Sequence, residues 1–414
     1  MTKVLIAGGG AAGMAAAIFA AEQGCRVHLF EQNEKLGKKL FITGKGRCNF
    51  TNACEMEDLF ANIVSNPKFL YSAFYGFSNQ DAIAFFERLG VPTKIERGGR
   101  AFPVSDHSSD IIRAMESRMK QLDVKIHLKS QVENLLVEEG CLRGCRLSNG
   151  AFVEGDCLMV ATGGLSYPST GSTGDGYSFA REAGHSIRPL RPALVPFATR
   201  EDYIWGMQGL SLKNVTLSIW DGKKKRFEGF GEMLFTHYGI SGPLALSASS
   251  YVGSCLDQGD LQAWLDLKPA LTEEQLDHRL LREFTNGANK CFRNILPSLF
   301  PAKMVPVMLR LGGIEGDRPA HTITREERRD FIRLTKAFPF TLSSLRGYNE
   351  AIITQGGVSV KEINPSTMES KYIKNLYFIG EVLDLDGVTG GFNLQIAWST
   401  AYAAAAAAAE GAKA

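Results

Sequence analysis

Four residues near the N-terminus have the types and the spacing of a dinucleotide-binding site. Gly8, Gly10 and Gly13 form a G-x-G-x-x-G run, and Glu31 follows 18 residues after Gly13. In such a run the first glycine allows a tight turn, the second lets a pyrophosphate approach the backbone at a helix N-terminus, and the third lets the helix pack on a strand. A carboxylate at the position of Glu31 can accept hydrogen bonds from a ribose 2′-hydroxyl.

The elements that must position these residues are visible in the surrounding sequence. Residues 3–7 (KVLIA) form a short apolar run typical of a buried strand, the alanine-rich stretch to about Gln23 is typical of a helix, and residues 27–30 predict a second strand ending at Glu31. A glycine motif alone would be weak evidence in a chain with 43 glycines. The order strand, loop, helix, strand and acid therefore carries the prediction that a dinucleotide binds here.

A basic loop follows this unit directly. Residues 35–52 (KLGKKLFITGKGRCNFTN) combine five basic side chains with three glycines. Basic side chains on a flexible backbone suit a pyrophosphate and the edge of a flavin ring. A solvated surface loop is the alternative, but the position just after the ribose acid favours contact with the cofactor.

Glycine-rich turns recur later in the chain. The turn at 161–164 (ATGG) follows an apolar strand, and the turn at 171–176 (GSTGDG) precedes a helix that begins near Tyr177. The segments 380–387 and 389–395 again place a strand, a glycine turn and a helix start together. A helix N-terminus there could stabilise negative charge at the N1/O2 edge of a reduced flavin.

Length and composition limit the classes of protein that fit. The chain has 414 residues, enough for two or three domains, and a formal net charge of +2 with 22% charged residues. This balance lacks the basic excess of a dedicated nucleic-acid binder, so we expect no nucleic-acid partner. The first strand begins at Lys3, which leaves no room for a signal peptide, and the alanine-rich stretch 394–409 fits a buried closing helix better than a membrane span. We expect a cytoplasmic protein without a membrane partner.

The eight cysteines include no C-x-x-C pair, and they are best explained as incidental thiols. No metal site is expected. The proline-rich stretch 188–196 marks a boundary, and short strands at 124–128, 131–138, 141–147 and 151–153 suggest a small antiparallel group. The expected organisation is a nucleotide-binding domain at 1–190, an inserted substrate-side domain at 191–325 (β-rich at 191–268, helical at 271–320), and a return to the first domain at 326–414.

Several long motifs, taken together, resemble one family. These are the run from Gly8, the stretch 38–49 (KKLFITGKGRCN), the motif 234–243 (LFTHYGISGP) and the terminal GE…TGGFN at 380–393. They resemble the BaiN-like family of FAD flavoproteins, also called aminoacetone-oxidase-like. The resemblance spans nearly the whole chain and implies an α/β fold, with a Rossmann-type FAD-binding domain interrupted by an insert that has a β-barrel-like part and a helical part.

The resemblance also implies roles for individual residues. The ribose would be held by Glu31 and the pyrophosphate by Gly10 to Gly13. The backbone of Val132 would contact the adenine, and the C-terminal motif would line the ribityl chain and flavin. The residues expected to bind FAD are Gly8, Gly10, Ala11, Ala12, Gly13, Glu31, Lys39, Thr43, Gly44, Arg47, Val132, Thr162, Gly163, Asp175, Gly380, Glu381, Gly391, Phe392, Asn393 and Leu394.

A flavin exchanges hydride at N5, so the protein must orient a small-molecule substrate over that atom and manage one proton. The resemblance favours NAD(P)H-linked reduction of a conjugated enone, such as a 3-oxo-4,6-dehydro bile acid or steroid. An oxidase of a small amine such as aminoacetone is the alternative. A flavin-containing RNA-binding or RNA-modifying protein is a third, motivated by the basic run 223–226. His237 in the insert is the candidate proton-handling residue and Tyr167 is a second candidate, although loop hydrogen bonding and packing would also explain them.

Overall fold

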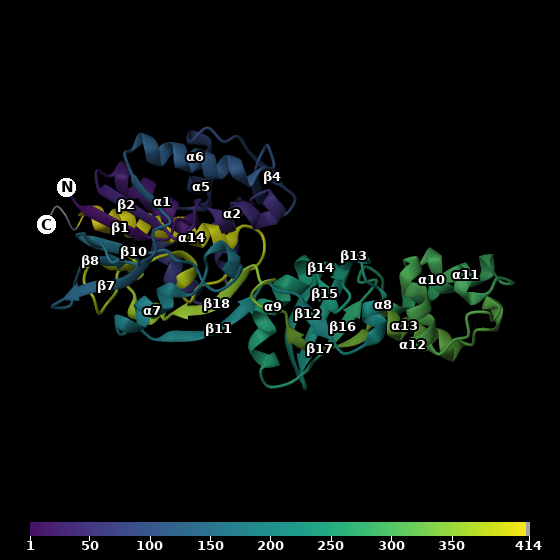
Figure 1. Ribbon diagram of the computed structural model, residues 1–414. Coiled ribbons are helices and arrows are strands. Elements are labelled where there is room, and N and C mark those ends of the chain that lie inside the picture. The colour runs from purple at the N-terminus through teal and green to yellow at the C-terminus, as the bar shows by residue number, and fades with distance from the viewer. Residues whose placement is uncertain (411–414) are drawn as a thin grey trace. The chain divides into compact units, whose positions relative to one another are not determined.

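The computed structural model describes residues 1–410 and divides them into two compact units (Figure 1). The first unit comprises Met1–Ala193 and the chain from Tyr348 onward, and the second is Leu194–Gly347. The second unit extends past residue 325, where the return was expected. The extension contains α13 (Arg325–Lys336) and β17 (Phe338–Leu345), and β17 is needed to close the barrel of that unit.

The first unit is built on a five-stranded parallel sheet with the order β19-β10-β1-β2-β6. Its central strands are almost entirely apolar because helices cover both faces of a parallel sheet. The chain leaves β1 for β2 on one side, and β10 lies on the other side, so the strand order reverses beside β1. The strands are β1 (Lys3–Ala7), β2 (Arg26–Glu31), β6 (Lys125–Leu128), β10 (Cys157–Val160) and β19 (Leu376–Phe378).

The expectation that residues 124–128 belong to the small antiparallel group is wrong, because these residues form β6 of the parallel sheet. Strand β6 pairs in parallel with β2, with Phe30 opposite His127. The rings of these two residues stack with centroids 4.7 Å apart, and the His28 and His127 rings stack at 5.3 Å. Ring contacts of this kind across two strands stabilise the pairing of an edge strand with its neighbour. The residues of β6 alone do not reveal that its partner is β2.

Two helices from opposite ends of the chain pack against each other in this unit. Helix α1 (Ala11–Glu22) contacts α14 (Phe392–Glu410), and the alanines on both let their backbones approach closely. Trp398 is buried in α14, and its indole N–H donates a 2.8 Å hydrogen bond to the Phe50 carbonyl. Within residues 1–410, no helix has the length and apolarity to cross a bilayer.

The remaining elements of the first unit surround this core (Figure 1). In the chain, the antiparallel sheet β7-β8-β9 lies between β6 and β10, and the strands of the pair β11-β18 lie between β10 and β19. The bounds are α2 (Lys38–Ile42), β3 (Thr51–Asn52), α3 (Met56–Ala61), α4 (Tyr71–Gly76), α5 (Asn79–Arg88), β4 (Thr93–Glu96), β5 (Arg100–Pro103), α6 (Ser108–Gln121), β7 (Val132–Glu138), β8 (Cys141–Leu147), β9 (Phe152–Glu154), α7 (Asp175–Glu182), β11 (Ile187–Ala193) and β18 (Ile353–Val358).

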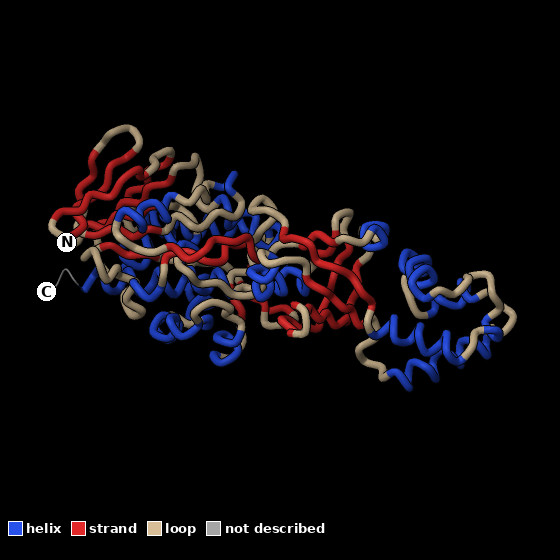
Figure 2. Tube along the Cα trace, turned by 90° about the horizontal axis from the view of Figure 1, so that it is seen from below, coloured by secondary structure: helices blue, strands red, loops and turns tan. Residues whose placement is uncertain are grey.

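The second unit joins a closed six-stranded barrel to a helical part, drawn red and blue in Figure 2. Two of its helices, α10 and α13, begin with capping boxes, at Thr272 with Gln275 and at Thr324 with Glu327. The parallel sheet of the first unit, together with the barrel and the helical part of the second, confirms the expected α/β fold class. The bounds are β12 (Phe197–Thr199), α8 (Asp202–Gly206), β13 (Ser211–Asp221), β14 (Lys224–Phe235), β15 (Gly239–Ser241), α9 (Pro243–Leu256), β16 (Leu261–Asp266), α10 (Glu273–Asn286), α11 (Phe292–Ile295) and α12 (Val305–Gly312), followed by α13 and β17.

Candidate functional site

A large pocket in the first unit lies beside β1, where the strand order reverses. Ligands of open parallel sheets bind at such a reversal, beyond the carboxyl ends of the strands. The pocket contains about 1290 Å³ of space, including the part open to solvent. Its wall is formed by residues from both ends of the first unit, from the glycine loop after β1 to the start of α14.

The glycine loop forms one wall of the pocket. Gly10 is the N-cap of α1 and lines the pocket, and a Cβ added there would meet no protein atom within 4 Å. Gly13 faces the protein instead, because its Cβ would lie 1.9 Å from the Gly8 carbonyl oxygen. The loop thus leaves the N–H groups of the first turn of α1 open to an anion, as a pyrophosphate requires.

Glu31 lies at the end of β2 and is buried, with 8% of its surface exposed. Its carboxylate accepts hydrogen bonds from the Gly9 N–H at 2.7 Å and from the Asn33 N–H at 2.8 Å. The Asn33 side chain donates a third bond, of 2.6 Å. The carboxylate is therefore fixed against the glycine loop in the wall of the pocket.

Backbone beside Glu31 extends this end of the pocket. The Ser130 N–H donates a 2.9 Å hydrogen bond to the Glu31 carbonyl, and Ser130, Gln131 and Val132 all line the pocket. The Gln131 side chain donates a 2.9 Å hydrogen bond to Asp175, which also lines it. Val132 and Asp175 thus both lie in the pocket wall next to Gln131.

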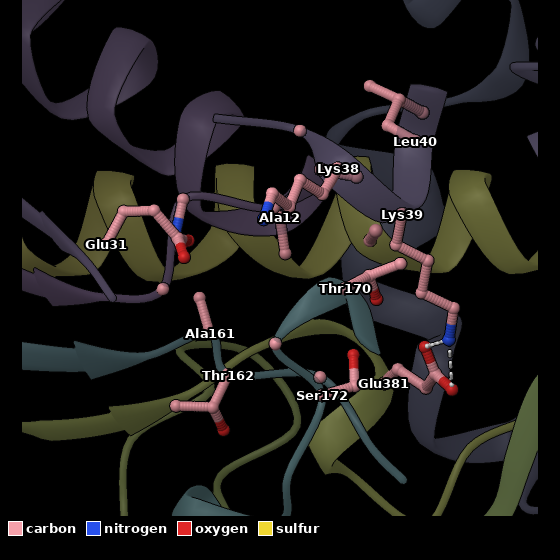
Figure 3. A pocket seen from close by; sticks show the side chains of 18 of the residues that line it. Ala12, Glu31, Lys38, Lys39, Leu40, Ala161, Thr162, Thr170, Ser172 and Glu381 are labelled. Atoms are coloured by element: carbon pink, nitrogen blue, oxygen red, sulfur yellow. Dashed lines mark hydrogen bonds and ion pairs between the residues drawn. The ribbon is translucent and has the colours of Figure 1, made fainter. Parts of the chain in front are cut away.

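An ion pair lies in a different part of the same pocket. The Lys39 ammonium is 2.6 Å from the nearer carboxylate oxygen of Glu381, and both side chains line the pocket (Figure 3). Ser166, which is fully buried, donates a 2.9 Å hydrogen bond to the same carboxylate. The pair joins α2 to the turn after β19.

A short strap, residues 168–174, contributes to the pocket wall. The Gln32 amide donates a 2.6 Å hydrogen bond to the Gly171 carbonyl, and the Asn33 amide donates a 3.0 Å bond to the Thr170 carbonyl. Sequence reasoning missed Gln32 and Asn33. Two amide side chains directly after the ribose acid, at the carboxyl end of a parallel strand, were the signal that could have identified them.

The structure brings most of the expected cofactor residues together, and leaves a smaller group outside the pocket wall. Gly13, Gly44, Arg47, Gly380, Gly391 and Phe392 are not among the lining residues. The expected residues that line the pocket are Gly8, Gly10, Ala11, Ala12, Glu31, Lys39, Thr43, Val132, Thr162, Gly163, Asp175, Glu381, Asn393 and Leu394.

Arg47 has other partners. Its guanidinium forms ion pairs with Glu96 at 2.5 Å and Asp106 at 2.6 Å, and lies 4.2 Å from the centre of the Phe102 ring. The hydrogen bond from Arg47 holds the pKa of Glu96 below its usual range. Arg47 thus ties the basic loop to β4 and β5.

His237 lies in the second unit, between β14 and β15, and is exposed. Its ring centre is 4.8 Å from that of Tyr238, and the Arg346 guanidinium lies 4.4 Å from the centre of the Tyr238 ring. Tyr167 is in the first unit with φ at 52°, and its N–H donates a 2.9 Å bond to the Tyr348 carbonyl. Burial raises the pKa of the Tyr167 hydroxyl.

The cysteines have no cofactor role that the described residues reveal. All eight are free thiols, and burial raises the pKa of Cys48 to about 12, which disfavours the reactive thiolate. In residues 1–410, no cluster of three or more His, Cys, Asp or Glu side chains is arranged to hold a metal ion.

Asp386 is a buried carboxyl next to the pocket residue Leu385. Its Oδ2 accepts a 3.1 Å hydrogen bond from the Gln355 amide, and Oδ1 has no partner among the described residues. Burial raises its pKa from 3.8 to about 6. In the folded protein this carboxyl therefore keeps its proton to a higher pH than in the unfolded chain.

This carboxyl predicts a pH-dependent stability difference. The folded state binds the proton more tightly, so the contribution of Asp386 to wild-type stability falls as the pH rises from about 4 to about 6, and Asp386→Asn removes that fall. The free energy of unfolding of Asp386→Asn, relative to wild type, should increase by up to about 3 kcal/mol between pH 4 and pH 7. Denaturant titrations across this range measure it. Glu154→Gln, at an exposed carboxyl, is the control, and a difference independent of pH would contradict the prediction.

Comparison with known proteins identifies the family. The model described as HI0933-like protein Rossmann domain matches residues 2–407. A 3-dehydro-bile acid delta(4,6)-reductase of Clostridium scindens is 34% identical, over 99% of this chain and 100% of that protein. A ribosomal RNA dihydrouridine synthase of Haemophilus influenzae is 33% identical, over 97% of both chains.

Solved structures support the fold. A 3-ketosteroid-delta4-(5alpha)-dehydrogenase from Rhodococcus jostii has a TM-score of 0.52 at 13% identity, with 99% of this chain and 97% of that chain covered. A flavocytochrome c3 fumarate reductase has a TM-score of 0.51 at 17% identity, with 99% and 78% covered. The chain belongs to the HI0933-like Rossmann family and is an FAD-dependent oxidoreductase.

Proposed function

We propose that this protein uses FAD and NAD(P)H to reduce a carbon–carbon double bond conjugated with a carbonyl group. The proposal is carried by the full-length similarity to a reductase of 3-dehydro bile acids. A second observation agrees with it. Dihydrouridine, named in the H. influenzae relative, arises by reduction of the uracil double bond, which is itself conjugated with a ring carbonyl. Both names describe one class of reaction on different molecules.

The residues of the pocket fit FAD by their own chemistry. The open glycine face at the α1 N-terminus suits a pyrophosphate, and the fixed carboxylate of Glu31 suits a ribose. Bound FAD would supply hydride through N5 to the β-carbon of the substrate. The protein must then exclude water, hold that carbon in position, and deliver a proton to the α-carbon.

We propose His237 as the residue that delivers this proton. Its imidazole is exposed at the junction of β14 and β15, so it is accessible to a substrate. The ring contacts Tyr238, which limits its orientations. His237→Gln should slow reoxidation of the flavin by the substrate and leave its reduction by NAD(P)H unchanged. Equal slowing of both half-reactions would contradict this role.

The half-reactions test the proposed function separately. Anaerobic mixing of the FAD-loaded protein with NADH and with NADPH should bleach the flavin absorbance with at least one of them. A 3-oxo-4,6-dehydro steroid should then restore the absorbance without oxygen. Failure of both nicotinamides would contradict the NAD(P)H-linked reductase. Peroxide release with aminoacetone in air would instead support the amine oxidase.

A uridine in ribosomal RNA is a second candidate substrate. It is favoured by two relatives named ribosomal RNA dihydrouridine synthase, from H. influenzae and, at 32% identity over 97% of this chain, from Escherichia coli. At the tip of the β13–β14 hairpin, Lys223 and Lys224 are exposed, whereas Lys225 and Arg226 form ion pairs with neighbours of their own hairpin. Such lysines could contact phosphates.

Ribosomal RNA distinguishes the two substrates. After incubation of the protein with NAD(P)H and ribosomal RNA that lacks dihydrouridine, mass spectrometry of the nucleosides should show dihydrouridine if RNA is the substrate. Lys223→Ala with Lys224→Ala should weaken RNA binding and reduce its dependence on salt. Turnover of the steroid without dihydrouridine formation would exclude the RNA candidate.

A further inference from the structure

The Lys39–Glu381 ion pair is enclosed more than a surface pair would be. The two side chains are 22% and 21% exposed, and the Lys39 ammonium lies 2.9 Å and 2.6 Å from the two carboxylate oxygens. Charges in such a site are poorly screened by solvent, so their effect on a ligand in the same pocket is large. A surface pair would contribute little.

The pair lies on the far side of the glycine loop from Glu31. Figure 3 shows Glu31 at one side of the pocket, Ala12 and the α1 N-terminus in the middle, and Lys39 with Glu381 at the other side. A dinucleotide whose ribose binds Glu31 and whose pyrophosphate binds α1 must continue toward the pair. Asn393 and Leu394, at the start of α14, also line the pocket. The redox-active ring therefore belongs at the end of the pocket that holds the two charges.

Two neighbouring side chains hold the pair in place. Thr354 donates its N–H to Glu381 at 2.9 Å, and its hydroxyl oxygen accepts from the Leu165 N–H at 2.8 Å and the Ser166 N–H at 3.1 Å. The Ser166 hydroxyl is 2.5 Å from the Lys39 ammonium and also donates to Glu381. Thr354 and Ser166 are both fully buried. Neither was identified by sequence.

We propose that Lys39 and Glu381 set the reduction potential of bound FAD in opposite directions, and that Ser166 and Thr354 are the positioning residues of the pair. The proposal rests on FAD binding, not on the identity of the substrate. Uptake of two electrons and one proton leaves the flavin ring with a net negative charge. The ammonium favours that charge and the carboxylate opposes it, so the wild-type potential is a balance of the two.

Three variants test the opposed effects. Lys39→Met should favour oxidised FAD, and Glu381→Gln should favour reduced FAD. Each should change the ratio of oxidised to reduced FAD about tenfold at a fixed applied potential, which corresponds to a shift of about 30 mV in the potential of a two-electron couple. The double variant should lie between them. The measurement is an anaerobic titration of the flavin absorbance with redox mediators. Lys35→Met, an equal charge change at an exposed site outside the pocket, should leave the potential unchanged.

The positioning role has its own test. Thr354→Val removes the hydroxyl that holds Leu165 and Ser166, and should shift both the potential and the absorbance maxima of bound FAD. Thr354→Ser keeps that hydroxyl and should restore both. A shift that serine does not reverse would contradict the positioning role.

The amount of FAD bound to the wild type and to each variant, measured as flavin released on denaturation, distinguishes a wrong cofactor assignment from a wrong inference about the ion pair. Wild-type protein without FAD would overturn the cofactor assignment itself. FAD bound normally with potentials that do not move in opposite directions would overturn the inference alone. Loss of FAD affinity in Lys39→Met, with an unchanged potential in Glu381→Gln, would also overturn it and make Lys39 a phosphate contact.

Discussion

Gly13→Ala should abolish FAD binding and lower the temperature at which the protein unfolds. The added Cβ would lie 1.9 Å from the Gly8 carbonyl oxygen and 3.4 Å from the Ala161 Cβ, so α1 would have to move away from β1. That helix is buried along most of its length and packs on α14, so it cannot move alone. Overpacking in a close-packed interior costs about 1–3 kcal/mol and sometimes more.

Thermal unfolding and flavin release check this expectation. Gly206→Ala is the matched control, because a Cβ there would meet nothing within 4 Å. Gly10→Ala separates fold from binding: it should leave the unfolding temperature of the FAD-free protein unchanged and still weaken FAD binding, since its methyl group would enter the pocket. Normal FAD content in Gly13→Ala would show that the loop can relax.

Glu31→Ala should weaken FAD binding by about 100-fold or more, which is about 3 kcal/mol. The carboxylate accepts three hydrogen bonds, from the Gly9 N–H and from the backbone and side chain of Asn33. Without it, buried donors lose their acceptor at a cost of about 1–3 kcal/mol each, and the ribose loses a charged partner. Both the FAD-free fold and the complex should be affected.

Equilibrium titration with FAD and denaturant unfolding of the FAD-free protein measure the two effects of Glu31→Ala. Glu34→Ala, which removes an exposed carboxylate paired with Lys38, should change neither by more than a few tenths of a kcal/mol. If Glu31→Ala binds FAD within threefold of wild type, this carboxylate does not hold the ribose.

The parts of the fold and site that the sequence predicts well are local. The glycine loop, Glu31 and the Rossmann-type unit follow from short-range constraints, because a tight turn and a helix start depend on adjacent residues. The end of the second unit at Gly347 was not predicted, because β17 belongs there only through pairing with β12 and β16. The sequence of β17 alone is compatible with either unit.

Side-chain partners from distant segments were the hardest to predict. Arg47 was expected at the cofactor because it lies in a basic loop, yet Glu96 and Asp106 come to it from beyond the next three α-helices. Ser166 and Thr354 are separated by 188 residues and meet only in the folded chain. A local pattern identifies which residues could do chemistry, whereas their partners depend on the topology.

The contact between α1 and α14 determines when, during synthesis, the first unit can finish folding. The pocket takes its first wall from residues 8–12 and its last from residues 393–397, and the whole second unit is synthesised in between. Domains generally fold as units during synthesis, N-terminal parts first. Here the first unit must wait with an unfinished sheet, because β19 and α14 are added last. FAD capture is therefore a late step of biosynthesis, and a ribosome-bound chain stalled before α14 would carry a folded barrel without its flavin.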